Sequence, residues 1–318
     1  MKGMVAVVIP AFRCEKTITA TLDSVLAQRR AVDFVVIVLD EPNLTLETMC
    51  REHEIKAEVL VNEDNLGVAA TRNIGFDHAK DRADYICFLD SDDVLHQDFI
   101  FSACAQYDLT PDTDAVFGNY LLWYDETDQA PLPPISTESG AVLEDALSGY
   151  LSHTGGHLLS FALINTSSIV AISVDGKFNN EYLRSNEDFE FFCRLFFQGK
   201  IIRIDDCCGW HKKMPGSLSS DQVLAWDCRS EAAKLLYVWL ESRNAEKSLL
   251  SKMKLIQHSS IRKSARLLWK QGNRKKATQK LLKSISRLQW KSFVQLLVLF
   301  LSVESRVAVK KMPGNNSV

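Results

Sequence analysis

Residues 85–93 read YICFLDSDD, an apolar run of five residues followed by three aspartates within four positions. Continuous apolar runs of this length are typical of a strand that is buried on both faces of a sheet. The polar residues that follow mark the point at which the chain leaves the sheet. This stretch therefore predicts a buried strand with an acidic loop at its carboxyl end.

Three similar runs precede this stretch, and helical patterns separate them. The predicted strands are Val5–Ile9, Phe34–Leu39, Glu58–Val61 and Tyr85–Leu89, and apolar residues recur with helical spacing at Thr17–Gln28, from about Leu46, and at Gly67–Ala79. Strands that alternate with helices in this way form parallel sheets covered on both faces. The sequence thus predicts an α/β fold with a mostly parallel, Rossmann-like sheet.

The later part of the chain has a different pattern. A helix is expected near Asp188 and a strand at Lys200–Ile204, and after about Ser220 the chain reads as helices only. A length of 318 residues is sufficient for one large domain with an appendage, or for two modest domains. We therefore expect a catalytic domain over residues 1–220 and a basic helical region over residues 221–318.

Polar residues follow each of the first four predicted strands. They are Ala11–Arg13, Asp40–Glu41, Asn62–Asn65 and Asp90–Asp93. Ligands of open α/β sheets bind beyond the carboxyl ends of the strands, where these segments should converge. This edge of the sheet is therefore the predicted functional site.

Asp90 and Asp92 are the strongest candidates for binding a cation. Carboxylates two positions apart, just past a buried strand, can both reach a hard cation. Mg²⁺ or Mn²⁺ is commonly held by one or two carboxylates, with phosphate oxygens completing the shell. The alternative is an aspartate-rich turn that caps a following helix, because Asp is a favoured N-cap residue.

Taken together, six ordered segments resemble a family 2 glycosyltransferase of the GT-A fold. They are Val7–Phe12, Asp40–Glu41, Asn65–Gly75, Phe88–Asp93, Asn186–Leu195 and His211 with Pro215–Ser219. The resemblance extends over roughly residues 4 to 220, and the order of the segments makes it specific. Two positions depart from the family: Asp40–Asn43 reads DEPN in place of Asp-Asp-Gly-Ser, and Thr71 replaces an alanine.

The resemblance implies a role for each matching position. The nucleotide-sugar site would include Pro10, Ala11 and Phe12, with Asp40 holding the nucleobase and Arg72 beside the nucleotide. Asp90, Ser91 and Asp92 would contact the donor. Asp90, Asp92 and His211 would bind the metal, Mg²⁺ or Mn²⁺, and Asp188 would be the catalytic base. The implied donor is a UDP-sugar, and the implied acceptor is a hydroxyl of a glycan or lipid-linked glycan in surface polysaccharide synthesis.

These roles are chemically coherent. A bound metal neutralises the charge that develops on the leaving diphosphate, and a separate carboxylate accepts the proton of the attacking hydroxyl. A single displacement of this kind would invert the anomeric centre. Each residue also has a plainer interpretation, since Arg72 could be a solvated helix residue, Glu187–Asp188 could complement a helix dipole, and His211 could be structural.

The charge is distributed very unevenly. Residues before Lys247 carry 20 basic and 39 acidic side chains, a net charge of -19, whereas residues from Lys247 onward carry 17 and 1, a net charge of +16. Basic residues there recur among Leu, Ile and Trp, which suits helices on an anionic membrane surface, with Trp290 and Phe293–Val303 dipping into the interface. The alternatives are a tail that packs on the acidic body, or one that binds nucleic acid. No nucleic-acid motif accompanies the charge, so no nucleic-acid partner is expected.

Localisation follows from what the chain lacks. Its eight cysteines include no C-x-x-C pair that would support a zinc ribbon or a thioredoxin-like site, and free thiols in a chain of this size fit a reducing cytosol better than a secreted disulfide scaffold. Met4–Ile9 is too brief for a signal peptide, and Phe293–Val303 is shorter than the roughly 20 residues that span a bilayer. We expect a cytoplasmic protein that is peripheral to the inner face of the membrane.

Two other functions compete with transfer of a sugar. Phe88–Val94 also resembles the D-x-D-x-V motif of haloacid dehalogenase phosphatases, with Asp205–Asp206 as a later acidic pair. That motif normally follows the first strand, whereas three strands are predicted before this one. A catalytically inactive sugar-nucleotide-binding scaffold at the membrane is the second alternative, and the intact Asp90, Asp92 and Asp188 argue against it.

Overall fold

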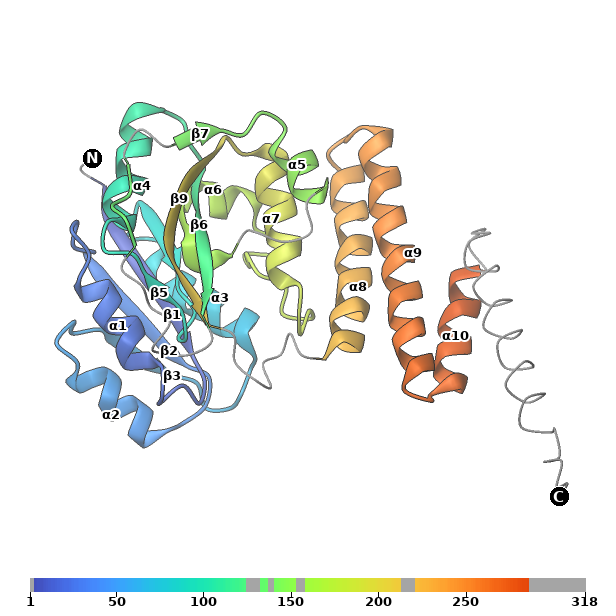
Figure 1. Cartoon of the computed structure of the whole chain (residues 1–318), viewed down its shortest axis with the longest axis horizontal. Coiled ribbons are helices and arrows are strands. Elements are labelled where there is room, and N and C mark those ends of the chain that lie inside the picture. Colours follow the sequence, from blue (N-terminus) through green and yellow to red (C-terminus); the bar gives the residue numbers. More distant parts are fainter. Residues whose placement is uncertain (1–2, 124–131, 137–139, 153–157, 213–220, 286–318) are drawn as a thin grey trace, which may run out of the picture. The chain divides into compact units, whose positions relative to one another are not determined.

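The computed structural model describes residues 3–123, 132–136, 140–152, 158–212 and 221–285. Contacts divide the chain into two compact units, residues 1–217 and 218–318 (Figure 1). Among the described residues, no helix has the length and apolar character that crossing a membrane requires. The predicted interfacial residues Trp290 and Phe293–Val303 lie outside the described part of the chain.

The first unit is built on a sheet with strand order β3-β2-β1-β4-β8-β6-β9-β5, and β7 pairs with β9. Its first half consists of β1 (Val5–Ala11), β2 (Phe34–Leu39), β3 (Glu58–Val61) and β4 (Tyr85–Phe88). These strands pair in parallel, and every residue of β1 is buried. The predicted strands are confirmed, with ends that differ by at most two residues.

The second half of the sheet is mixed. It contains β5 (Val94–Leu95), β6 (Ala115–Trp123), β7 (Gly140–Val142), β8 (Ala162–Asn165) and β9 (Ile201–Lys212). β8 is antiparallel to β4 and β6, and β6 is parallel to β9. β9 extends well beyond the predicted Lys200–Ile204. Its register against β6 shifts after Ile204, so the polar Asp205 and Asp206 are accommodated without ending the strand.

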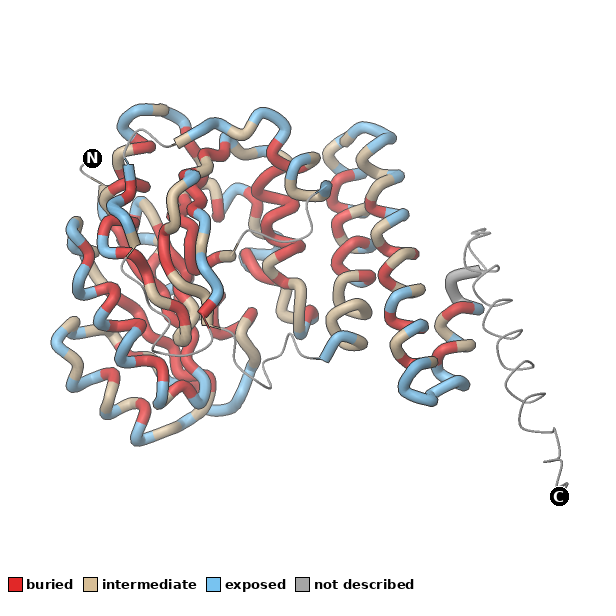
Figure 2. Tube along the Cα trace, viewed as in Figure 1, coloured by how far each residue is buried: buried red, intermediate tan, exposed pale blue. Residues whose placement is uncertain are grey.

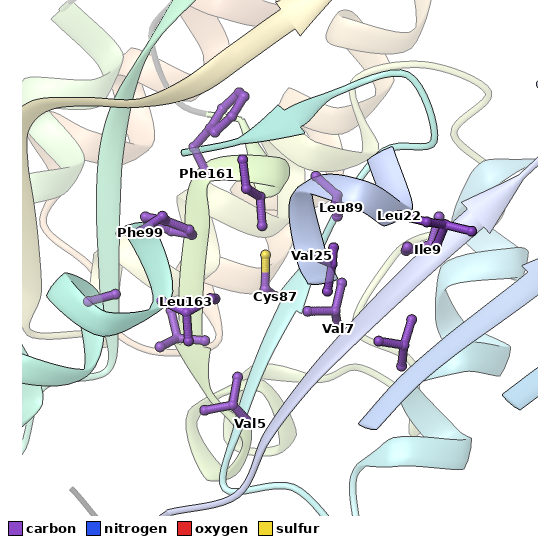
Figure 3. Packing of buried hydrophobic residues seen from close by; sticks show 14 of the residues in the cluster. Val5, Val7, Ile9, Leu22, Val25, Cys87, Leu89, Phe99, Phe161 and Leu163 are labelled. Atoms are coloured by element: carbon purple, nitrogen blue, oxygen red, sulfur yellow. The ribbon is translucent and has the colours of Figure 1, made fainter. Parts of the chain in front are cut away.

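Helices α1 (Ile18–Leu26), α2 (Leu44–Glu52) and α4 (Phe99–Leu109) supply one side of the core. Val5, Val7 and Ile9 belong to this layer, and Figure 3 shows Val7 near Val25 and Ile9 near Leu22 of α1. Cys87 lies in the same cluster and is fully buried. The side chains of β1 therefore pack alternately into the helical layers on the two faces of the sheet, which is why the strand is apolar throughout.

Helix α3 (Val68–Ala79) packs closely on the opposite face of β1. A Cβ atom added at Gly75 would stand 2.4 Å from Cγ1 of Val8, so this approach requires glycine. Phe178 stacks on Phe88 with ring centroids 4.5 Å apart and meets Phe191 edge-on. Phe191 belongs to α7 (Glu187–Gln198), so α7 shares this face with α3. Figure 2 shows the strands buried between the helices.

Shorter elements complete the first unit: α5 (Ala146–Ser152), the 3-10 turn η2 (Leu159–Phe161) and α6 (Thr166–Ile172). Arg194 of α7 is fully enclosed in this region, with 1% of its surface exposed. It pairs with Glu190 at 2.7 Å and donates to the carbonyl oxygens of Ile172 and Phe178. This network fixes α7 to the end of α6 and to the loop before α7.

The second unit is helical in its described residues, as predicted. It consists of α8 (Gln222–Glu241), α9 (Lys247–Lys270) and α10 (Arg274–Ile285), with α9 packed against both neighbours. Lys280 of α10 pairs with Asp227 of α8 and donates to Ser264 of α9 at 2.9 Å. One lysine therefore links all three helices of this unit.

Candidate functional site

The carboxyl end of β1 presents an aromatic side chain and a cation. Pro10 and Ala11 are the last residues of the strand and are buried, whereas Phe12 is 43% exposed. Arg13 adopts a left-handed backbone conformation, and its guanidinium lies 4.8 Å from the centroid of the Phe12 ring. Arg13 also pairs with Glu41 at 2.8 Å, which joins the ends of β1 and β2.

The carboxylate of Asp40 accepts hydrogen bonds from neighbouring residues of the protein. Asp40 is 4% exposed, and its carboxylate accepts hydrogen bonds from the backbone of Leu66 (2.9 Å) and Gly67 (3.0 Å) and from the side chains of Thr71 (2.6 Å) and Asn62 (3.3 Å). A carboxylate offers about four acceptor sites. Asp40 therefore organises the loop that leads into α3, and its predicted contact with the nucleobase stays a prediction.

Glu41 has the more accessible carboxylate at this strand end. Its side chain is 27% exposed and contacts Arg13. The family resemblance includes Glu41 in a matching segment and, within DEPN, as a departure from Asp-Asp-Gly-Ser, but it implies no role for this residue. Its pairing with Arg13, 28 residues away in the chain, was not foreseen.

The acidic loop after β4 brings several carboxylates together. The backbone N–H of Asp90 donates to the hydroxyl of Ser160 at 3.1 Å, and Ser91 is half-buried in the same loop. Burial, together with the carboxylates of Asp93 and Asp90, raises the pKa of Asp92 to about 7. Concentrated negative charge of this kind favours a cation as counter-charge.

Asp93 holds His211 at the edge of this loop. Oδ1 of Asp93 lies 2.8 Å from Nδ1 of His211 and accepts the backbone N–H of Lys212 at 3.2 Å. The contact depends on the pairing of β5 with β9, which places Val94 opposite Trp210. Burial alone would lower the pKa of His211, but its hydrogen bond to Asp93 and the surrounding aspartates raise it. His211 therefore belongs to the acidic cluster and is held there through Nδ1.

Arg72 lies between the acidic loop and the start of α7. One terminal nitrogen is 2.5 Å from Oδ1 of Asp90, and the other is 3.0 Å from Oε1 of Glu187. Arg72 is only 5% exposed, so the interpretation of a solvated helix residue is wrong. Its predicted place beside the nucleotide stays a prediction. In the structure, its guanidinium forms ion pairs with two carboxylates of the protein.

Asp188 is the second residue of α7. Asn186, which precedes the helix, adopts a left-handed conformation with φ of 62°, and the first turn carries Glu187, Asp188 and Glu190. Negative charge is favourable at a helix N-terminus. Burial and the neighbouring Asp188 carboxylate raise the pKa of Glu187 to about 7, an effect only partly offset by Arg72. Asp188 itself is half-buried.

A neighbouring contact fixes the loop before α7. Asn73 donates to the carbonyl oxygen of Asn179 at 2.9 Å and to Glu181 at 3.0 Å, and it accepts the backbone N–H of Asn179 at 3.0 Å. Arg72 and Asn73 therefore both connect α3 to the segment that carries Asp188. These contacts have no local signature in the sequence, because Glu187 and Asn179 lie more than 100 positions from Arg72 and Asn73.

The acidic cluster suits a divalent cation by its chemistry. Oδ2 of Asp93 is buried and has no partner among the described residues, and the crowded carboxylates of Asp90 and Asp92 are hard oxygen donors. Within the described ranges, no group of three or more His, Cys, Asp and Glu side chains is arranged to hold a metal. The donor set present is the pair of carboxylates that nucleotide-bound Mg²⁺ or Mn²⁺ uses, with phosphate oxygens completing the coordination.

Segments that are distant in the sequence thus meet at one edge of the sheet. Arg72 joins Asp90 to Glu187 and so brings the start of α7 to the acidic loop, while Asp93 brings His211 to the same loop. Pro10, Ala11, Phe12 and Asp40 lie at the adjoining ends of β1 and β2. Asp40 contacts the loop before α3, and α3 carries Arg72.

A family model matches the first half of the chain. Residues 6–167, about half of the chain, match the family described as glycosyl transferase family 2. The matched segment contains Asp40, Arg72, Asp90 and Asp92 and ends before Asp188 and His211.

Several curated proteins are similar over shorter stretches. The amylovoran biosynthesis glycosyltransferase AmsB of Erwinia amylovora is 34% identical over 99 residues, which is 29% of this chain and 32% of that protein. The UDP-Glc:alpha-D-GlcNAc-diphosphoundecaprenol beta-1,3-glucosyltransferase WfaP of Escherichia coli is 30% identical over 128 residues, which is 39% of this chain and 48% of that protein. The chain thus spans less than half the length of these relatives.

Solved structures extend the likeness over most of the chain. Residues 1–349 of S. aureus TarS in complex with UDP-GlcNAc superpose with a TM-score of 0.62 and 19% identity, covering 82% of this chain and 72% of that one. Likeness at this level of identity establishes the fold, and it confirms the predicted GT-A architecture.

Proposed function

The chain belongs to glycosyl transferase family 2, and from that membership we propose that it moves a sugar from a uridine diphosphate sugar to a hydroxyl of a lipid-linked glycan. The observation that carries the proposal is the convergence of the acidic loop Asp90–Asp93 with the start of α7 through Arg72. A donor diphosphate and an attacking hydroxyl need these two kinds of carboxylate on opposite sides of the sugar.

Each carboxylate has a separate task in this proposal. Asp90 and Asp92 would hold Mg²⁺ or Mn²⁺, and His211, fixed by Asp93, would lie beside the diphosphate. When bound, the cation would neutralise the charge that develops on the leaving diphosphate. Asp188 would accept the proton of the acceptor hydroxyl as that oxygen attacks, and the single displacement would invert the anomeric centre.

The nucleobase would bind at the ends of β1 and β2. The exposed ring of Phe12 offers a flat apolar surface, and Glu41 and Arg13 place an acceptor beside a donor. Uracil presents a matching donor and acceptors along its edge. Asp40 would act indirectly, by holding the loop Asn62–Gly67 in place.

The names of similar proteins support the choice of donor and acceptor. TarS is described in complex with UDP-GlcNAc, and WfaP and WfgD of Escherichia coli are named for transfer from UDP-Glc to a diphosphoundecaprenol-linked sugar. A role in polysaccharide synthesis is in keeping with AmsB. The family membership excludes the phosphatase alternative, and β4 is the fourth strand along the chain, where that alternative needs the first.

A transfer assay tests this function. Purified protein would be incubated with Mn²⁺, a lipid diphosphate-linked monosaccharide and each member of a panel of UDP-, GDP- and CDP-sugars. We expect acceptor-dependent release of UDP from one UDP-sugar and loss of that release when the metal is chelated. An inactive scaffold would release no nucleotide with any donor, and release of GDP or CDP would contradict the uridine assignment.

We also propose that the second unit attaches the enzyme to an anionic membrane surface on the cytoplasmic side. No acidic residue occurs between Lys247 and Val303. The turn between α9 and α10 is surrounded by exposed basic side chains: Arg266, Lys270, Arg274, Lys275 and Lys276. If the second unit binds a membrane, the enzyme and a lipid-linked acceptor would lie at the same membrane surface. Anionic headgroups suit such a cluster, because each Lys or Arg near the surface contributes about 1 kcal/mol.

Charge reversal at this turn is expected to weaken membrane attachment. Replacing Arg274, Lys275 and Lys276 by Glu should lower the affinity for vesicles of anionic lipid by roughly 100-fold or more, because three attractive charges become repulsive. Co-sedimentation with vesicles at low and high salt measures the effect. The control replaces the exposed Lys16, Lys56 and Lys234, which changes the net charge equally. Equal weakening by both variants, or no binding by the full chain, would contradict a membrane site at this turn.

A further inference from the structure

We infer that Glu187 is a positioning residue for Asp188, and that it acts through a buried chain of charges, Glu187–Arg72–Asp90, that joins the start of α7 to the acidic loop. The inference rests on the proposed function, in which Asp188 is the base and Asp90 faces the donor. Neither the resemblance nor the comparisons assigned a role to Glu187.

The three charges come from three separate elements. Arg72 lies on α3, Asp90 follows β4, and Glu187 begins α7, 115 positions from Arg72. The two terminal nitrogens of Arg72 are divided between the carboxylates, at 2.5 Å from Asp90 and 3.0 Å from Glu187. Its Nε has no partner among the described residues. The guanidinium therefore serves as a bridge between these two carboxylates.

Burial makes this bridge costly to break. The side chains of Arg72 and Glu187 are 6% and 9% exposed. In a poorly solvated site, removing one member of an ion pair is strongly destabilising, because the remaining charge is left uncompensated. Asp90 is more accessible, at 32%, which leaves part of its carboxylate open toward the donor.

Glu187 is better explained by this bridge than by capping of its own helix. The residue before α7, Asn186, makes no capping hydrogen bond through its side chain, and the carboxylate of Glu187 reaches Arg72 on a different helix. Successive helical residues project about 100° apart. Fixing Glu187 therefore sets the direction in which the next residue, Asp188, leaves the helix. A base displaced by about 1 Å can lose 100-fold in rate.

A double-mutant cycle separates positioning from general stabilisation. Glu187→Gln keeps the shape and one acceptor oxygen but removes the charge. We expect it to lower kcat by roughly 10- to 100-fold, the usual effect of a group that orients a functional residue, while the KM for the UDP-sugar changes less than about twofold. In an Asp188→Asn background the same change should cause no further loss, because residues that act as a unit are non-additive. Glu52→Gln, at an exposed carboxylate on α2, is the matched control and should leave kcat unchanged.

Thermal unfolding of each variant identifies those that fold. If Glu187→Gln does not fold, Arg72→Lys replaces it in the cycle, since lysine keeps the charge but lacks the forked guanidinium that bridges two carboxylates. A wild-type kcat for the bridge variant, or a loss that multiplies with that of Asp188→Asn, would overturn the inference while leaving the proposed function intact. Full activity of Asp188→Asn alone would instead overturn the base assignment and the inference together.

Discussion

Asp188→Asn is expected to bind the sugar donor normally and to lose transfer by roughly 10²- to 10⁴-fold, the usual contribution of a general base. An amide has nearly the same shape as a carboxylate but cannot accept the proton of the attacking hydroxyl. Glu187 and Glu190 would still supply negative charge to the first turn of α7. The measurement is kcat with saturating donor, together with the dissociation constant of UDP.

The control for this variant lies in the same segment. Asp175 occupies an exposed turn with φ of 51°, a conformation that asparagine adopts readily. Asp175→Asn should therefore retain full activity. Turnover of Asp188→Asn close to that of the wild type, with a true acceptor, would show that another group removes the proton.

Asp92→Asn is expected to remove most of the metal-dependent part of nucleotide binding. Burial and the neighbouring carboxylates of Asp93 and Asp90 raise the pKa of Asp92, and a divalent cation would offset the repulsion between the carboxylates. Loss of a group that merely orients a metal ligand already costs roughly 10- to 100-fold in metal affinity. We therefore expect the affinity for UDP with Mn²⁺ to fall by at least about tenfold, as measured by calorimetry.

The exposed Asp81 provides the matched substitution outside the site. Asp81→Asn should bind UDP and Mn²⁺ as the wild type does. An unchanged affinity of Asp92→Asn, with the same dependence on Mn²⁺, would remove Asp92 from the proposed set of metal ligands.

The parallel half of the sheet could be predicted from sequence because its signals are local. Phe34–Leu39 and Glu58–Val61 coincide with the observed strands. Phe34–Leu39 is buried at nearly every position, as a strand covered on both faces must be, whereas Glu58–Val61 is a short edge strand that is still marked by a run of apolar residues. The helix expected near Asp188 begins at Glu187 for a similarly local reason, the acidic residues that precede an apolar pattern. The rule that ligands bind at carboxyl ends of strands then indicated which edge to consider.

The connections within the site could not be predicted from local patterns. Arg72 looked like an exposed helix residue because its partners, Asp90 and Glu187, lie 18 and 115 positions away. The hydrogen bonds that the Asp40 carboxylate accepts likewise depend on the fold of the loop that leads into α3. Only the three-dimensional structure shows which polar side chains have protein partners and which face outward.

The pairing of Asp93 with His211 illustrates the same limit. It requires β9 to continue past Asp205 and Asp206, which the polar sequence disfavours and the register shift against β6 permits. The burial of Arg194, by contrast, has a weak local signal in the sequence. An arginine among phenylalanines, with Glu190 one turn earlier, indicates an enclosed ion pair, and the structure contains one.

The central claim is that this edge of the sheet binds a uridine diphosphate group together with a divalent cation. Calorimetric titration of the wild-type chain with UDP, in Mn²⁺ and again with excess chelator, tests it most directly. Two carboxylates without a cation would repel the diphosphate, so we predict binding in Mn²⁺ that is at least about tenfold tighter than in chelator. Equal affinity under both conditions, or no binding of UDP under either, would contradict the claim.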